Sequence, residues 1–434
     1  MLTDAESDWP KLVESFDASR LSKIAASLVG DRLSCYQSAL PMMALRFLIF
    51  FLVAFLGRSP AENRLNHLPS GEGTRLEKAL QLAKGNRSEL TKALESIPPP
   101  ERPGLEFLLE NMPSIDLQSL QASFLLENVS LAYLSMTTAP WARQIPTAIF
   151  LNDVLPYASL NERRDSWRAL LREVSVPIVA AAQTPTEAAL ALNKHLFSTL
   201  KVRYSTKRKK PDQSPLESIE SGLASCSGLA ILMVDACRSV GVPARVVGTP
   251  LWTNLRGNHT WVEIWDGDWH FLGAAESDPQ GLDRGWFKGD ASRAQRDNSA
   301  HAIYASSFQR TDVIFPLVWN LGVDWVSAVN VTDRYVAQQP APQAAIRFLL
   351  RVLDHRGQRV AAQSTITDPA NATLHLQGLS RDESADLNNL LTFPLAPNHT
   401  YHLEIQYGGR SVTRKITTIA HPGGEETLTV SIPN

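Results

Sequence analysis

The sequence predicts an α+β protein with a helical N-terminal region, a mixed core of helices and strands, and a C-terminal β-sandwich. From about residue 71 to 200, Leu, Ala, Glu, Lys and Arg recur at three- and four-residue spacing, which is typical of amphipathic helices. One strongly apolar helix and several β-branched runs follow, and the final segment alternates strand-like runs with polar turns. We therefore expect a helical accessory region at 62–189, a core at 190–337 and a β-sandwich at 338–434.

Composition excludes several classes of protein. With 434 residues, 44% of them hydrophobic, the chain is long enough for two or three globular domains. Lys and Arg number 42 against 44 Asp and Glu, so the net charge of −2 provides no general attraction for nucleic acid or an anionic membrane. The basic run at 207–210 lacks interleaved aromatic residues that could stack on bases, so we interpret it as a solvated loop. We expect no nucleic-acid partner.

The N-terminal part contains one long apolar run, residues 39–57, in which Arg46 is the only charged residue. Read from Met42 or Met43, the run has the short basic start, apolar centre and small-residue end of a signal peptide. We interpret residues 1–61 as a wrongly assigned start followed by a signal peptide, which predicts export to the periplasm or the extracellular space. A membrane anchor through residues 39–57 is the alternative.

Cys226 is the most informative residue of the core. The three cysteines, at positions 36, 226 and 237, are too few for a disulfide framework and form no Cys-x-x-Cys pair. Cys226 opens an apolar run that ends at Gly241-Val-Pro243, which predicts a helix with this thiol at its N-terminus. The positive end of the helix dipole stabilises a thiolate there. Cys237 lies within the apolar helix, so we assign it to packing.

Two predicted strands follow the helix. Residues 244–249 form the first, and His259, Trp261, Glu263 and Trp265 share one face of the second because side chains alternate along a strand. A tight turn at 266–268 then predicts a hairpin. A helix that presents Cys226 beside a strand that presents His259 would bring a nucleophile and a base together, as acyl transfer through a thioester requires.

In this order, these residues resemble the transglutaminase-like superfamily over about residues 190–335. The resemblance is carried by Cys226, by Gly241-Val242-Pro243-Ala244-Arg245, by His259-Thr260-Trp261-Val262-Glu263 and by Trp269. It implies a papain-like core whose Cys-bearing helix packs on an antiparallel sheet. It also implies that Cys226 is the nucleophile and His259 the general base and acid, with peptide or protein as the substrate.

The third catalytic residue departs from the family pattern. The resemblance implies an Asp about four residues after Trp269, but that position is Gly273. We assign the orienting carboxylate to Glu276, because a carboxylate fixes the imidazole tautomer and stabilises the imidazolium. Asp278 is the alternative, and a third interpretation is that both carboxylates only solvate a loop.

Other candidate residues give weaker signals. We expect His270 to lie on a strand surface, and His301 has no spacing that pairs it with Cys226. The sequence has no His-x-x-x-His motif or Cys/His cluster, so we expect no metal and no cofactor. Trp286 and Tyr335 either line a substrate cleft or pack in the core, and packing is favoured.

Beyond a Pro- and Gln-rich linker at 338–342, five strand-like runs and two Gly-Gly turns predict the small antiparallel sandwich. The runs are 345–353, 372–376, 400–407, 411–418 and 426–432. This part resembles the transthyretin-like or immunoglobulin-like domains that follow many extracellular enzymes. Because we find no catalytic cluster in it, we interpret it as a binding or spacing module.

Two functions follow as hypotheses. In the first, a thiol enzyme attacks a peptide or glutamine carboxamide carbonyl and forms a thioester that water or an amine resolves, with a cysteine hydrolase favoured over a cross-linking transferase. In the second, a catalytically weak or inactive transglutaminase-like module binds peptide or glycan. The departure at Gly273 favours the second, and the presence of both Cys226 and His259 favours the first.

We predict that the native protein begins near Glu62, because cleavage after the small residues that follow the apolar run would remove everything before it. Mass spectrometry of the protein from its natural host measures this. Peptides from residues 1–41 would contradict the prediction, and an intact apolar run in the membrane fraction would favour the anchor.

Overall fold

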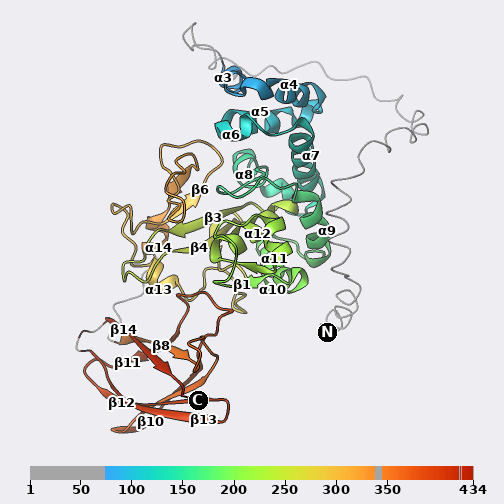
Figure 1. Cartoon of the computed structure of the whole chain (residues 1–434). Helices are drawn as coiled ribbons and strands as arrows, with labels where there is room; N and C mark the ends of the chain where they lie inside the picture. The colour runs from blue at the N-terminus through green and yellow to red at the C-terminus, as the bar shows by residue number, and fades with distance from the viewer. Residues whose placement is uncertain (1–73, 338–344, 420, 422, 434) are drawn as a thin grey trace, which may run out of the picture. The chain divides into compact units, whose positions relative to one another are not determined.

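The computed structural model describes residues 74–337, 345–419, 421 and 423–433 (Figure 1). The apolar run at 39–57 and the predicted linker at 338–342 lie outside the described residues. Among those that are described, no helix has the length and apolar character needed to cross a membrane.

Helices fill the part of the chain before the sheet. They are α3 (Arg75–Leu82), α4 (Arg87–Ser96), α5 (Arg102–Asn111), α6 (Ser114–Leu117), α7 (Ala122–Thr138), α8 (Thr147–Asp153), α9 (Arg168–Ile178) and α10 (Pro185–Leu200), with short 3₁₀ turns at Lys84–Asn86, Pro99–Glu101 and Ala142–Gln144. α10 starts where sequence signals place it, because Thr184 accepts a hydrogen bond from Glu187 N and Pro185 occupies the first turn. α9 and α10 both pack against the helix that carries Cys226.

That helix is α12 (Cys226–Ser239), and every residue from Ser227 to Ser239 is buried. It packs on β3 (Ala244–Thr249) and β4 (His259–Trp265) of a five-stranded sheet in the order β5-β4-β3-β6-β7. The remaining strands are β5 (Trp269–Leu272), β6 (Tyr304–Ser306) and β7 (Ala328–Asn330), and all pairings in this sheet are antiparallel. Short elements complete this region: β1 (Arg203–Tyr204), α11 (Pro215–Ser221), β2 (Leu223–Ala224), α13 (Lys288–Ala291) and α14 (Thr332–Val336). The predicted helix, strand and hairpin are therefore confirmed.

Arg168 ties the helical region to the far end of α12. It is 3% exposed, and its guanidinium donates to Asn128 Oδ1 on α7 and to the carbonyls of Val154, Leu155 and Pro156. A further bond of 3.0 Å reaches the carbonyl of Arg238 in the last turn of α12. Because one planar cation satisfies several buried acceptors, it fixes the helix whose other end bears Cys226.

The C-terminal part is a β-sandwich of two sheets, β10-β9-β12-β13 and β11-β8-β14. Its strands are β8 (Ile346–Leu353), β9 (Gln363–Asp368), β10 (Asn371–Leu379), β11 (Leu391–Leu395), β12 (Thr400–Tyr407), β13 (Arg410–Thr417) and β14 (Glu425–Ser431). Buried residues of both sheets, among them Phe348, Ile366 and Leu403, form one core. The α+β class and the sandwich are confirmed, but the sandwich is not wholly antiparallel as predicted, because β14 runs parallel to β8. β9 and β11 are strands that the sequence did not indicate.

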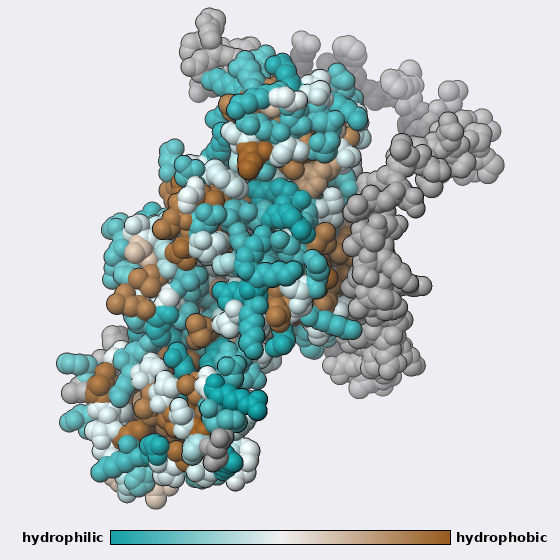
Figure 2. Space-filling view, in the orientation of Figure 1, coloured by the Kyte–Doolittle hydropathy of each residue, from teal (hydrophilic) through white to brown (hydrophobic). Residues whose placement is uncertain are grey.

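A buried charge network joins the sandwich to the core. Arg347 of β8 pairs with Asp290 of α13 at 2.6 Å and with Glu425 of β14 at 2.8 Å, and Arg256 pairs with the same two carboxylates. Each of the two cations contacts both carboxylates, one from the core and one from the sandwich, so the network holds the two parts in register. On the face in Figure 2, hydrophobic side chains lie in scattered groups among hydrophilic ones.

We predict that Arg168→Leu lowers the free energy of unfolding by about 3 kcal/mol, because several buried carbonyls lose their donor. Urea denaturation followed by circular dichroism measures this. Arg172→Leu is the matched control on the same helix: Arg172 donates to Ser239 O and to an exposed Thr138 hydroxyl, so its loss should cost below about 1 kcal/mol. Equal losses in the two variants would contradict the role given to Arg168.

Candidate active site

Cys226 is the first residue of α12, as predicted. Ser225 caps this helix: its hydroxyl accepts from Gly228 N at 3.0 Å and donates to the carbonyl of Pro211. The cap leaves the amides of Cys226 and Ser227 without an acceptor inside the helix. The half-buried thiol therefore lies at a helix end that favours negative charge.

His259 is the first residue of β4 and lies beside Cys226. One hydrogen bond sets this approach: the hydroxyls of Ser227 and Thr260, each one residue beyond Cys226 or His259, lie 2.9 Å apart. The Cys226 Sγ, a ring nitrogen of His259 and a carboxylate oxygen of Asp386 all lie within 4.8 Å of one another. The structure thus brings together the thiol and the imidazole that the sequence analysis paired.

Aromatic rings enclose the imidazole. Its centroid lies 5.8 Å from that of Trp261 in a stacked arrangement, 4.7 Å from Trp286 and 5.0 Å from Phe287. The side chain of His259 is 3% exposed, and neither ring nitrogen has a hydrogen-bond partner within standard distance. The rings restrict the rotation of the imidazole, so packing limits the directions in which its nitrogens can point.

A chain of hydrogen bonds fixes Trp261 beneath the imidazole. Trp261 Nε1 donates to Tyr335 Oη at 2.8 Å, and Tyr335 Oη donates to Glu263 Oε1 at 2.8 Å. Arg245 on β3 pairs with the other Glu263 oxygen at 2.6 Å. The Glu of the family pattern thus anchors the Trp on which His259 stacks, and Tyr335 packs in the core as favoured.

Asp386 is the site residue that the sequence analysis missed. It lies in the loop between β10 and β11 of the sandwich, is 5% exposed, and its Oδ2 lies 3.6 Å from His259 Nδ1. Its Oδ1 accepts from Asn388 N at 2.8 Å, so one oxygen fixes the local turn while the other faces the imidazole. Nothing in the polar stretch around Asp386 distinguishes it from an ordinary Asx turn.

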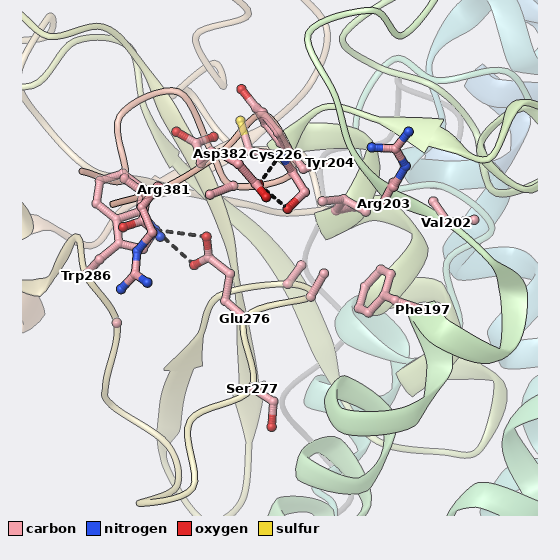
Figure 3. A pocket seen from close by; sticks show the side chains of 18 of the residues that line it. Phe197, Val202, Arg203, Tyr204, Cys226, Glu276, Ser277, Trp286, Arg381 and Asp382 are labelled. Carbon is pink, nitrogen blue, oxygen red and sulfur yellow. Dashed lines mark hydrogen bonds between the residues drawn. The ribbon is translucent and has the colours of Figure 1, made fainter. Parts of the chain in front are cut away.

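Glu276 takes the space left by Gly273. A Cβ atom on Gly273 would collide with the Glu276 carboxylate, which folds back because Ala275 adopts a φ of 64°. Asn193 of α10 holds this turn by donating to Gly273 O and accepting from Ala275 N, both at 2.9 Å. Trp286 Nε1 donates to the two Glu276 oxygens at 2.9 and 3.0 Å (Figure 3). Glu276 therefore binds Trp286, near His259 but not paired with it, and its catalytic role stays a prediction.

Asp278, the alternative to Glu276, points elsewhere. Its Oδ1 accepts from Gln280 N at 2.8 Å, and its Oδ2 lies 3.6 Å from Arg284 Nε. Of the other histidines, His270 binds Asp283 at 2.7 Å and His301 binds the carbonyl of Leu251 at 3.0 Å. Each of these contacts has a local structural role.

The two carboxylates have opposite electrostatic environments. Burial raises the pKa of Glu276 to about 7, although His259 and the Trp286 hydrogen bond act in the other direction. Burial also acts to raise the pKa of Asp386, but the facing imidazole holds it below the ordinary value. Burial alone would lower the pKa of His259, yet Asp386 and Cys226 together raise it to about 10. The arrangement therefore favours an imidazolium facing an ionised Asp386.

Two cavities meet at the thiol. The larger, about 880 Å³, is lined by both apolar and charged side chains, including Phe197, Arg203, Trp286 and Arg381 (Figure 3). The smaller, about 240 Å³, is lined on another side by Trp319, whose buried indole N–H has no partner. Cys226, Tyr204 and Asp386 line both cavities, so a molecule in either one can reach the sulfur.

The same group of side chains has the chemistry of a metal site. Among the described residues, Cys226, His259 and Asp386 offer sulfur, nitrogen and oxygen ligands that could hold one divalent ion such as zinc. A nucleophile with a base and a carboxylate needs the same three groups. Chelation therefore belongs among the controls for any activity of this site.

Residues 172–291 match the family model of the transglutaminase-like superfamily. The predicted resemblance is confirmed for this segment, which contains Cys226, His259 and Glu276. At family level, the match supports a cysteine-dependent enzyme of the hydrolase or acyltransferase kind. No curated protein matches the sequence.

Three solved structures are similar to parts of the chain. A proposed cysteine protease from Cytophaga hutchinsonii is 21% identical over 26% of this chain and 40% of its own, with a TM-score of 0.23. Red sea bream transglutaminase is 11% identical over 64% of this chain and 65% of its own, with a TM-score of 0.28. A proposed protease from Parabacteroides distasonis is 8% identical over 68% and 52%, with a TM-score of 0.23. This chain spans less than two thirds of the length of each of these structures.

We predict that iodoacetamide alkylates Cys226 in the folded protein much faster than Cys237. Cys226 lines two cavities, whereas Cys237 is fully buried and burial raises its pKa far above the usual range. Peptide mass mapping after timed quenching measures both rates, and the unfolded protein is the control because it should react at both positions. Equal rates in the folded protein would contradict the prediction.

Proposed function

We propose that this protein catalyses acyl transfer or hydrolysis at a peptide or glutamine carboxamide bond through a thioester on Cys226. The observation that supports this most strongly is the meeting of Cys226, at a helix N-terminus, with the enclosed imidazole of His259 where two cavities join. The family match over residues 172–291 supports the same class of chemistry.

The first half of the reaction forms the thioester. The imidazolium of His259 holds the proton given up by Cys226, and the thiolate attacks the carbonyl carbon of the bound amide. The first amides of α12, those of Cys226 and Ser227, donate to the oxyanion of the tetrahedral intermediate in this mechanism. His259 then gives its proton to the leaving nitrogen, so the carbon–nitrogen bond breaks and an amine is released.

The second half resolves the thioester. Water or a second amine loses a proton to His259 and attacks the thioester carbon, and the thiolate leaves beside the imidazolium, which restores the starting pair. The two cavities provide separate places for the acyl group and for the amine or water. The volume of the larger cavity, about 880 Å³, supports a peptide or protein as the substrate, and we favour hydrolysis over cross-linking.

We predict that Cys226→Ala abolishes turnover and that His259→Ala reduces it almost as far, because nucleophile and base act as one unit. Release of ammonia or amine from a set of glutamine-containing peptides measures turnover, with and without an added primary amine. Substrate binding, followed by fluorescence anisotropy, should persist in both variants.

A chelator provides the control for metal chemistry. A thiol mechanism predicts unchanged turnover after treatment with EDTA and loss of turnover after alkylation of Cys226. If EDTA abolished turnover and zinc restored it, a metal-dependent reaction would replace the proposal. If wild type and Cys226→Ala bound peptide equally and neither turned it over, the protein would be a binding module.

A further inference from the structure

Asp386 is the charged group that lies nearest to His259 in the described part of the chain, yet it belongs to the sandwich and not to the transglutaminase-like segment. The sandwich thus contributes a buried carboxylate to the site. A carboxylate taken out of water costs free energy unless a cation or hydrogen-bond donors compensate for it. Neighbouring groups must therefore compensate for the negative charge of Asp386.

The two side-chain oxygens of Asp386 have different partners. Oδ1 accepts from the backbone N–H of Asn388, and Oδ2 faces His259 Nδ1 at 3.6 Å. Arg359 binds the carbonyls of Ala385 and Asp386 from within the sandwich, at 2.7 and 3.0 Å, so its charge supports the backbone of the loop. The protonated imidazole of His259 is therefore the cation that compensates for the negative charge on Asp386 Oδ2.

The loop that carries Asp386 also forms hydrogen bonds with the core. Leu387 N donates to Tyr204 Oη at 3.1 Å, and Asn388 Nδ2 donates to the carbonyl of Asn258, which directly precedes His259, at 3.1 Å. Arg256 donates to Asn388 O at 2.8 Å and takes part in the charge network that joins sandwich and core. These bonds fix the position of Asp386 relative to β4.

We propose that Asp386 of the sandwich is the positioning residue that orients His259 and stabilises its protonated form, so that the active site is assembled from both parts of the chain. This inference rests on the proposed function for its catalytic consequence. The role of the sandwich then extends beyond the binding or spacing that the sequence analysis expected.

Glu276 is the other buried carboxylate near His259, so its effect on the imidazole can be compared with that of Asp386. It occupies the space of the missing side chain at position 273, but both of its oxygens accept from Trp286. A carboxylate held by an indole and buried enough to bind a proton near neutral pH is a weaker counter-ion than an ionised one facing the ring. Removing each of the two carboxylates is therefore expected to change the pKa of His259 by a different amount.

The test measures His259 directly, in full-length Cys226→Ala protein, where neither turnover nor a thiolate contributes. NMR titration of histidine-labelled protein, with the signal assigned by His259→Asn, gives the pKa of the ring. Asp386→Asn should lower this pKa by about one unit or more, as expected for losing an opposite charge at this distance. Asp386→Glu should restore part of the shift, and Glu276→Gln should change it less than Asp386→Asn does.

Asp382→Asn is the control for removing a carboxylate from the same loop. Asp382 bonds locally to Ser384, so its loss should leave the pKa of His259 unchanged. If Glu276→Gln lowered the pKa and Asp386→Asn did not, the orienting role would belong to Glu276 and our proposal would be wrong. If neither variant changed it, the proposal would also fail.

Turnover separates this inference from the proposed function. With Cys226 present, Asp386→Asn should lower kcat by about 10²-fold or more with little change in KM, since the loss of an orienting carboxylate acts in the transition state. A lowered His259 pKa in a protein whose wild type shows no turnover would support the Asp386–His259 pair and refute the enzyme. Normal turnover in a correctly folded Asp386→Asn protein would refute the positioning role alone.

Discussion

The site depends on one contact, the hydrogen bond between Ser227 and Thr260. Each hydroxyl lies one residue beyond a functional side chain, so the bond fixes the start of α12 relative to the start of β4. All of α12 beyond Cys226 is buried, and Arg168 holds its far end, so the helix has little freedom to slide. Because the Ser227–Thr260 hydrogen bond holds the first turn of α12 against the start of β4, Cys226 and His259 lie next to each other.

Sequence reasoning succeeded where the signal was local. An apolar run opened by Ser225-Cys226 and closed by Gly241 and Pro243 predicts a helix with its thiol at the N-terminus, and the structure has one. The strand β3, the β4–β5 hairpin and most of the sandwich follow from alternation and turn residues in the same way. β9 was missed because its exposed face is as polar as the turns around it.

The positions of the Glu276 and Asp386 carboxylates could not be predicted from the sequence. Glu276 reaches the space over Gly273 only because Ala275 adopts a left-handed conformation that Asn193 stabilises, and no sequence pattern indicates such a turn for Ala. Asp386 comes from another sheet, and its approach to His259 depends on a charge network of residues dispersed from 256 to 425. Contacts between distant segments leave no periodic trace in a single sequence.

If acyl transfer proceeds through Cys226, a thioester on its sulfur can be trapped before water or an amine resolves it. Full-length protein is mixed with an activated ester of a glutamine-containing peptide, quenched in acid within the first turnovers, and analysed by intact-mass and peptide mass spectrometry. We expect one added acyl group, located on Cys226, that hydroxylamine removes and that Cys226→Ala does not acquire. Product formation without an adduct, or an adduct on another residue, would contradict it.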